Sequence, residues 1–199
     1  MFGARRPSAG EVRISDAAHG VRSTRDAIRS GIALIPEDRR GQGVVELMPI
    51  FKNVTLASLD RDMVAGTLRP QRERVRTRRL MDGLAVKATG PDALTRTLSG
   101  GNQQKVALAK WLATDARVLL FDEPTQGLDV RAKADIHRII HGLAEAGAAV
   151  LIVSSDLEEA LGLAERVLVM HSGRLVAEFR DPPFEPEAVM EAITMGDQA

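Results

Sequence analysis

The chain has 199 residues and a formal net charge of zero, with 44% hydrophobic and 27% charged residues. These values are ordinary for a globular protein and exclude a disordered tail, a fibrous repeat or a coiled-coil rod. There is no cysteine, which excludes disulfides, thiolate zinc sites and cysteine nucleophiles. A neutral chain has no global field to attract nucleic acid, and no apolar run approaches the ~18 residues of a membrane span. We therefore expect a cytoplasmic protein without a nucleic-acid partner.

The charges are distributed unevenly along the sequence. Residues 1–90 carry 17 basic and 10 acidic side chains, whereas residues 91–199 carry 10 and 17. Much of the basic excess lies in one predicted helix, around which the arginines spread rather than lining one face. Either a solvated helix or a docking surface for an acidic partner would account for them. The arginines are Arg69, Arg72, Arg74, Arg76, Arg78 and Arg79.

The first half of the chain alternates short apolar stretches with helical spacing. Strands are predicted at 11–14 and at 32–35, the second ending before Pro36, and a helix capped by Ser23 or Thr24 lies between them. Residues 49–59 and 70–86 have helical periodicity, so the middle third is predicted to be helical.

From residue 98 onward the pattern is typical of an α/β fold. Helices and strands alternate, and the strands at 118–121 and 149–153 are apolar on both faces, which predicts that they are buried. The C-terminal half is therefore predicted to be a mostly parallel sheet with crossover helices. The other predicted elements are helices at 102–113, 135–146 and 157–164, and strands at 167–170 and 174–179.

Two adjacent carboxylates, Asp122 and Glu123, follow the first buried strand, at the edge where open α/β sheets bind ligands. An ionised pair there needs a cation or water to solvate it. The spacing suits one carboxylate on Mg²⁺ and one facing a water, which is the form of a Walker B strand. The plainer alternative is a solvated Asp-Glu-Pro turn.

A serine, two glycines and an asparagine, Ser99, Gly100, Gly101 and Asn102, precede the helix that leads to this strand. Glycines allow backbone N–H groups to approach an anion at the start of a helix. The alternative is an ordinary helix cap. We favour a phosphate cradle because of the order in which cradle, helix, carboxylate strand and Asp129 follow one another.

Residues 98–112 (LSGGNQQKVALAKWL) and 121–130 (FDEPTQGLDV) resemble the ATPase subunits of monosaccharide-importing ABC transporters, which import ribose, xylose and galactose. Residues 31–46, 51–56 and 153–170 are similar to the second of the two cassettes in such subunits. The resemblance implies an ABC-type P-loop NTPase fold. It places a helical subdomain at roughly 49–113, a Walker B and D-loop core at roughly 114–180 and a C-terminal helix at roughly 185–195.

The resemblance also implies a function, in which hydrolysis of ATP with Mg²⁺ is coupled to monosaccharide uptake at the inner face of the cell membrane. The implied partners are a second cassette facing head to tail, integral-membrane permease subunits and, indirectly, a sugar-binding protein. Residues 99–102 would contact a phosphate held by the other cassette, and Asp122 would hold Mg²⁺ through water. Glu123 would polarise the attacking water, and Asp129 would act across the dimer.

The sequence departs from the family's pattern in three places. The 199 residues contain no G-x-x-x-x-G-K-[ST] phosphate loop, and residues 1–10 look like the segment that follows the Walker A helix. We therefore expect an N-terminally truncated cassette. Glu37 stands at the Q-loop position of a glutamine, and Ser155 at the H-loop position of a histidine. Both changes are similar to those of the degenerate second cassette and predict poor catalysis at this cassette's own site. The missing phosphate loop predicts poor hydrolysis by the chain alone.

Other functions stay open beside this one. The chain could be a non-catalytic interaction module that supplies the signature loop in trans to a complete cassette. A soluble ABC protein of DNA repair or translation is disfavoured by the neutral charge and by the sugar-importer form of the signature. A zinc site on His137 and His141 is disfavoured because Arg138 stands where a zinc protease has glutamate.

Overall fold

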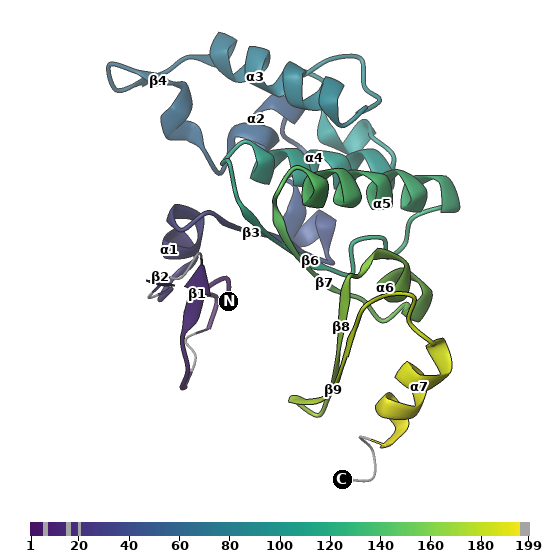
Figure 1. Cartoon of the computed structure of the whole chain (residues 1–199). Helices are drawn as coiled ribbons and strands as arrows, with labels where there is room; N and C mark the ends of the chain where they lie inside the picture. Colours follow the sequence, from purple (N-terminus) through teal and green to yellow (C-terminus); the bar gives the residue numbers. More distant parts are fainter. Residues whose placement is uncertain (6–7, 15–16, 20, 196–199) are drawn as a thin grey trace. The chain divides into compact units, whose positions relative to one another are not determined.

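The structure is a computed structural model that describes residues 1–5, 8–14, 17–19 and 21–195. The chain divides into two compact units, Met1–Ile152 and Val153–Ala199. Figure 1 follows their elements along the sequence from purple to yellow. Within the described residues, no helix is both long and apolar enough to cross a membrane.

The first unit is built on a three-stranded sheet with the strand order β3-β6-β7. β3 (Ile32–Ile35) and β6 (Val118–Asp122) are parallel, with Ile35 opposite Phe121. Both strands are apolar and largely buried, which confirms their prediction from the sequence. Because they run in the same direction, the residues that follow them emerge at one edge of the sheet.

The N-terminal part of the chain contributes buried side chains to a small core that includes residues of β3 and β6. β1 (Val12–Ile14) pairs antiparallel with β2 (Ala17–His19). α1 (Thr24–Arg29) is capped by Ser23, one of the two residues predicted to cap it, and the Ser23 hydroxyl accepts a hydrogen bond from a backbone N–H of the first turn. The buried residues that pack together here are Val21, Ala27, Ile32 and Leu120.

A helical layer packs around α4 (Gly100–Leu112), in which residues 103–111 are all buried. α4 contacts α2 (Ile50–Thr55), α3 (Pro70–Gly83) and α5 (Val130–Glu145). A helix buried on every side occupies the centre of its layer. Shorter elements connect these helices: a π-helical turn at Arg39–Gly43, 3₁₀ turns at Leu59–Asp62 and Thr95–Thr97, and the hairpin of β4 (Met63–Val64) and β5 (Thr67–Leu68).

Buried charged groups fix how α3 packs. Glu73 is fully buried and accepts hydrogen bonds from Lys52 Nζ at 2.9 Å and from Thr55 Oγ1 at 2.7 Å, both on α2. Arg76 pairs with Asp62 and donates to a backbone carbonyl at the end of α4 at 3.1 Å. Because a buried charge without partners is costly, these bonds specify how α3 packs on its neighbours.

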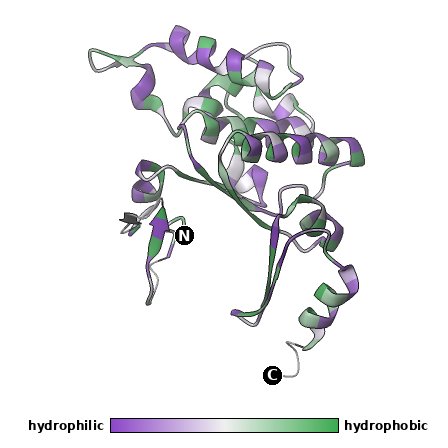
Figure 2. Cartoon of the chain, viewed as in Figure 1, coloured by the Kyte–Doolittle hydropathy of each residue, from purple (hydrophilic) through white to green (hydrophobic). Residues whose placement is uncertain are grey.

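The second unit contains α6 (Leu157–Leu163), the strands β8 (Arg166–His171) and β9 (Arg174–Arg180), and α7 (Pro186–Met195). Its core consists of Val167, Val169 and Val189, with partly buried apolar side chains around them. In Figure 2 the hairpin and α7 carry many green, hydrophobic residues, whereas α3 of the first unit is largely purple.

The C-terminal sheet differs from its prediction. β8 and β9 form an antiparallel hairpin rather than part of a parallel sheet. Ser172 and Gly173 join them with φ values of 46° and 78°. Positive φ at both central residues of a two-residue turn matches the twist of antiparallel strands. The Ser-Gly pair was therefore the sequence signal for a hairpin.

The strand predicted at 149–153 forms, but its predicted burial is wrong. The side chains of β7 (Ala149–Val153) alternate between exposed and half-buried, and Leu151 and Val153 are 40% and 55% exposed. In the described structure β7 lies at the edge of its sheet. Apolar composition predicts a strand, whereas burial depends on what packs against it.

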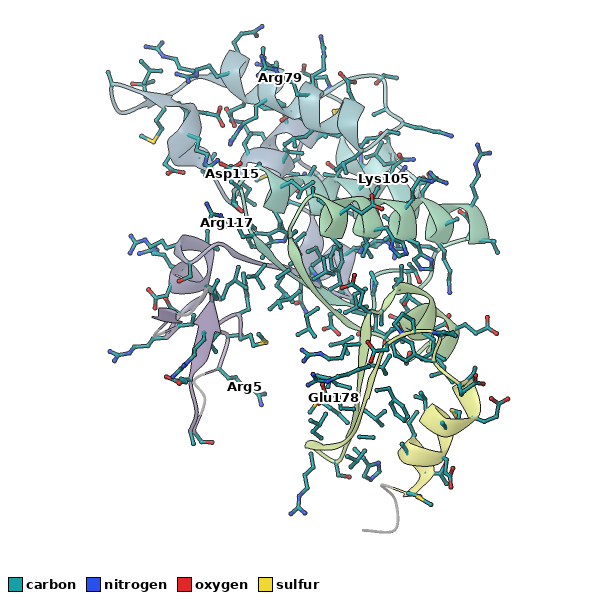
Figure 3. The ribbon with its side chains drawn as sticks, viewed as in Figure 1. Arg5, Arg79, Lys105, Asp115, Arg117 and Glu178 are labelled. Carbon is teal, nitrogen blue, oxygen red and sulfur yellow. The ribbon has the colours of Figure 1, made fainter. Side chains whose placement is uncertain are left out.

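Two helix starts and the arginine distribution also differ from expectation. α4 begins at Gly100 rather than at about 102, and α5 begins at Val130 rather than at 135. The arginines of α3 were predicted to spread around the helix, but Arg72, Arg76 and Arg79 line one open pocket of about 340 Å³. Figure 3 shows these side chains, with Arg79 labelled. α2 is shorter than predicted and ends at Thr55.

Candidate functional site

The two predicted carboxylates lie where β6 ends. Asp122 is the last residue of the strand and is exposed. Glu123 follows with a φ of 46°, in the left-handed region that non-glycine residues seldom adopt. The turn is closed by hydrogen bonds from Gln126 N to the Glu123 carbonyl at 3.2 Å and from Leu128 N to the carbonyl of the buried Thr125 at 3.1 Å. Such unusual backbone geometry is concentrated at functional sites.

The predicted phosphate cradle is the first turn of α4. Ser99 is the N-cap residue, and its side chain makes no capping hydrogen bond within the described structure. Its hydroxyl accepts instead from Asn102 Nδ2 at 2.9 Å, and Asn102 Oδ1 accepts from the backbone N–H of Lys87 at 2.7 Å. Among the described residues, the first turn of this 13-residue helix is therefore left without a side-chain cap, which favours an anion at that position.

The two glycines of the cradle also permit close packing within this chain. A Cβ on Gly100 would lie 2.9 Å from Nη2 of Arg39, and one on Gly101 would lie 2.8 Å from Cβ of Ala132. The first contact joins α4 to the π-helical turn, and the second joins it to α5. Both glycines therefore have a packing role that the sequence did not reveal.

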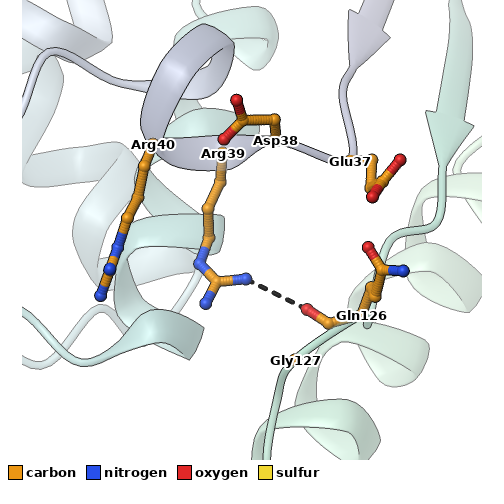
Figure 4. Close-up of a pocket in the computed structure, with 6 residues that line it drawn as sticks. All are labelled: Glu37, Asp38, Arg39, Arg40, Gln126 and Gly127. Carbon is orange, nitrogen blue, oxygen red and sulfur yellow. Dashed lines mark hydrogen bonds between the residues drawn. The ribbon is translucent and has the colours of Figure 1, made fainter.

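An open pocket of about 480 Å³ lies between the loop after β3 and the loop after β6 (Figure 4). Arg39 reaches across it and donates from Nη1 to the carbonyl of Gln126 at 3.1 Å. Glu37, predicted at the Q-loop position, thus lies beside the loop that carries Glu123. The full lining is Glu37, Asp38, Arg39, Arg40, Gln126 and Gly127.

Arg39 and Gln126 were not predicted from the sequence. No motif or periodicity distinguishes Arg39 from the adjacent Arg40, and the contact joins residues 87 positions apart. The turn that carries Arg39 is capped by Asp38, whose Oδ1 accepts from Gly41 N at 2.9 Å. A short Asp-x-x-Gly spacing was the one local signal that this turn is ordered.

A buried lysine fixes the other end of the same turn. Lys110 of α4 donates from Nζ to the carbonyl of Gly43 at 2.6 Å. Burial lowers the pKa of Lys110 to about 8. Its ammonium lies 5.1 Å from the ring centroid of Trp111. The single tryptophan of the chain therefore neighbours a titrating group on the helix that begins at the cradle.

Two further predicted site residues, Asp129 and Ser155, lie at the starts of helices. Asp129 is the N-cap of α5, where its Oδ1 accepts from Ala132 N at 2.9 Å. Ser155 belongs to the second unit and is exposed just before α6. The first unit thus brings together Glu37, the cradle and the carboxylate loop, and Arg39 touches both of the last two.

The sequence model of the ABC transporter family matches residues 1–126. The chain belongs to this family.

Its relatives include ribose import ATP-binding proteins. That of Pseudomonas putida is 49% identical over 179 residues, which are 90% of this chain and 35% of the relative. That of Geobacillus kaustophilus is 40% identical over 198 residues, which are 100% of this chain and 40% of the relative. The chain therefore spans 35–40% of the length of these two relatives.

Solved structures support the fold. A nucleotide-free ATP-binding cassette from an ABC transporter superposes with a TM-score of 0.75 at 18% identity, over 100% of this chain and 77% of that one. A dimeric cassette bound to ADP and Pi superposes with a TM-score of 0.72 at 22% identity, over 90% of this chain and 77% of that one. The predicted α/β fold of an ABC-type cassette is confirmed.

Proposed function

We propose that this chain is the part of an ABC importer's ATP-binding subunit that supplies a signature loop and a carboxylate loop, in a system that takes up a ribose-type monosaccharide. The observation that carries the proposal is the 40–49% identity to ribose import ATP-binding proteins over nearly the whole chain. Its place would be the inner face of the cell membrane, beside permease subunits that receive sugar from a binding protein.

The uncapped first turn of α4 supports a role in binding a phosphate. Ser99, Gly100 and Gly101 would direct N–H groups and a hydroxyl at a phosphate of a nucleotide held by another cassette. Asn102 would act indirectly, because its amide holds the Ser99 hydroxyl at 2.9 Å. In this arrangement the chain lends its signature loop in trans.

The carboxylate loop fits a magnesium nucleotide by its donor chemistry. Mg²⁺ at nucleotide sites takes one or two carboxylates together with phosphate and water oxygens. Asp122 offers such a carboxylate, exposed at the strand end, and would hold the ion through water. ATP with Mg²⁺ would supply the phosphoanhydride bond to be hydrolysed. Glu123 would orient and polarise a water, and Asp129, exposed at the start of α5, would face the partner cassette.

Association with a second cassette tests this proposal. The full chain is mixed with an isolated cassette that carries a complete Walker A loop, and co-sedimentation is measured with and without ATP and Mg²⁺. ATP should increase association, because a ligand that binds the complex better than the free chains stabilises it. Ser99→Arg should abolish the increase by filling the cradle.

His141→Arg is the matched control, since it adds the same side chain at an exposed position of α5. The proposal fails if ATP has no effect on the parent chain, or if Ser99→Arg associates as well as the parent. Hydrolysis by the mixture that is lost in Glu123→Gln would support a catalytic role for the carboxylate loop. Association without such hydrolysis would favour the non-catalytic module.

A further inference from the structure

We propose that Arg39 is a positioning residue that couples the loop after the carboxylate pair to the first turn of α4 within one chain. The inference rests on the proposed function for its consequence, but its structural basis is independent of any nucleotide. It gives a role to a side chain outside the signature and carboxylate motifs.

The guanidinium of Arg39 contacts both loops at once. Nη1 donates to the Gln126 carbonyl at 3.1 Å, in the turn that begins at Glu123. Nη2 lies so close to Gly100 that a Cβ there would be 2.9 Å away. A planar guanidinium holds its terminal nitrogens in a fixed relation to each other, so movement of one loop displaces the contact with the other.

The turn that carries Arg39 is anchored on both sides. Asp38 caps its start through Gly41 N. Its end is held by Lys110, whose Nζ donates to the Gly43 carbonyl at 2.6 Å. Gly43 packs so closely on α4 that a Cβ there would lie 3.4 Å from Cβ of Ala107. The base of the Arg39 side chain is therefore fixed to α4 while its tip reaches the loop after β6.

The guanidinium is also held at an energetic cost. Its Nε is buried and has no hydrogen-bond partner in the described structure. Its positive charge lies beside the N-terminal end of a helix, where the helix dipole is itself positive. An anion at the first turn of α4 would relieve the charge repulsion, because Nη2 lies beside Gly100. Binding there would therefore change the balance that keeps Arg39 on Gln126, and the carboxylate loop would respond.

The consequence for the proposed function is that the signature and carboxylate loops take up their working geometry together. A phosphate bound at Gly100 would compete for the guanidinium, because a hydrogen bond to a charged acceptor is stronger than one to a carbonyl. Phosphate binding at the cradle would then weaken the bond from Arg39 to Gln126 and change the conformation of the turn that carries Glu123.

Amide hydrogen exchange in the full chain without nucleotide tests the coupling. The reporters are the Gln126 and Leu128 amides, whose hydrogen bonds close the carboxylate turn. Arg39→Met keeps an unbranched stem but removes the guanidinium, and exchange of the two amides should become about tenfold faster. Arg39→Lys should recover part of the protection. Arg78→Met is the matched control and should leave exchange unchanged, because Arg78 is exposed on α3 and does not line this pocket.

A double-variant cycle separates coupling from simple bracing. Gly100→Ala places a methyl group against Nη2 and should speed exchange at Gln126 and Leu128, although neither residue is in α4. In the Arg39→Met background, Gly100→Ala should add nothing further at these amides. The proposal is overturned if Gly100→Ala leaves their exchange unchanged, or if it has the same effect with and without Arg39.

The association assay supplies the functional arm. Arg39→Met should weaken ATP-dependent association with the Walker A cassette, while Arg78→Met should retain it. If both arginine variants associate like the parent, the coupling has no functional consequence and the inference fails. If the parent chain shows no ATP-dependent association, the proposed function fails, and the exchange cycle alone decides whether Arg39 couples the loops.

Discussion

Lys105 of α4 and Asp135 of α5 form an ion pair of 2.9 Å that ties the helix of the signature loop to the next helix along the chain. The Lys105 side chain is 6% exposed, whereas that of Asp135 is 30% exposed. Lys105 Nζ also donates to the Ala85 carbonyl at 3.3 Å. The two partners are therefore unequal, because only the lysine would be left buried if the pair were broken.

Asp135→Asn should destabilise the chain more than Lys105→Met. Asp135→Asn leaves the nearly buried Lys105 ammonium without a carboxylate to balance its charge, and should lower the free energy of unfolding by about 2 kcal/mol. Lys105→Met replaces the lysine by an apolar side chain of similar length and should cost less than about 1 kcal/mol. Urea unfolding followed by Trp111 fluorescence measures both. Arg138→Ala, which removes an exposed partner of Asp135, should change stability by less than about 0.5 kcal/mol. The reverse order for the two main variants would contradict this account.

The same pair predicts a loss of stability in acid. The hydrogen bond from Lys105 holds the pKa of Asp135 below its ordinary value of 3.8. A lowered pKa in the folded chain stabilises it above pH 3.8, and this contribution disappears as the pH falls through the folded pKa. The difference in urea midpoint between the parent and Asp135→Asn should therefore be full at neutral pH and shrink below pH 3.8. A difference that stayed constant down to pH 2 would show that the carboxylate's charge is not involved.

Lys110 predicts a gain of stability at high pH. Its pKa is lowered by burial from 10.5 to about 8. Between these values the unfolded chain binds more protons than the folded chain, so this group makes the fold more stable as the pH rises from about 8 to 10.5. Lys110→Met should remove that rise, and the exposed Lys87→Met should leave it in place. Urea midpoints at pH 7 and pH 9.5 measure the effect. Parallel curves for the parent and Lys110→Met would contradict it.

Trp111 provides a second measurement of the same titration. Its ring lies 5.1 Å from Lys110 Nζ, so loss of the positive charge should change its fluorescence with a midpoint at about pH 8. This transition should be absent from Lys110→Met. A midpoint near 10.5 in the parent would show that the lysine is solvated.

Local patterns in the sequence were sufficient for the framework of the first unit. β3 and β6 are continuous apolar runs, and Ser23 caps α1 through a contact three residues along the chain. Asp122 and Glu123 were predicted as site residues because they come at the end of a buried strand. These features depend on neighbours in sequence, which is why composition and spacing predict them.

Features that depend on distant contacts were not predictable in this way. Arg39 meets Gln126 across 87 positions, and Lys110 meets Gly43 across 67. The exposure of β7 is likewise decided by what packs against it. The start of α5 is an intermediate case. Asp129 was predicted only to act across a dimer of cassettes, yet it also caps α5 by accepting from Ala132 N, three residues along the chain, which is a local signal.

Gly101 provides the last prediction, because it distinguishes packing from anion binding at the cradle. A Cβ on Gly101 would lie 2.8 Å from Cβ of Ala132 on α5, closer than two such carbons can approach. Gly101→Ala should therefore separate α4 from α5 and lower the free energy of unfolding by about 1–3 kcal/mol, even though alanine is the better helix former. Ala132→Gly should restore much of the loss in the double variant by removing the opposing methyl group. Ser99→Ala, which alters the cradle without this contact, should have a smaller effect on stability. Urea unfolding of the four proteins decides the matter: a Gly101→Ala variant as stable as the parent, or one that Ala132→Gly does not rescue, would mean that the close approach of the two helices does not constrain this position.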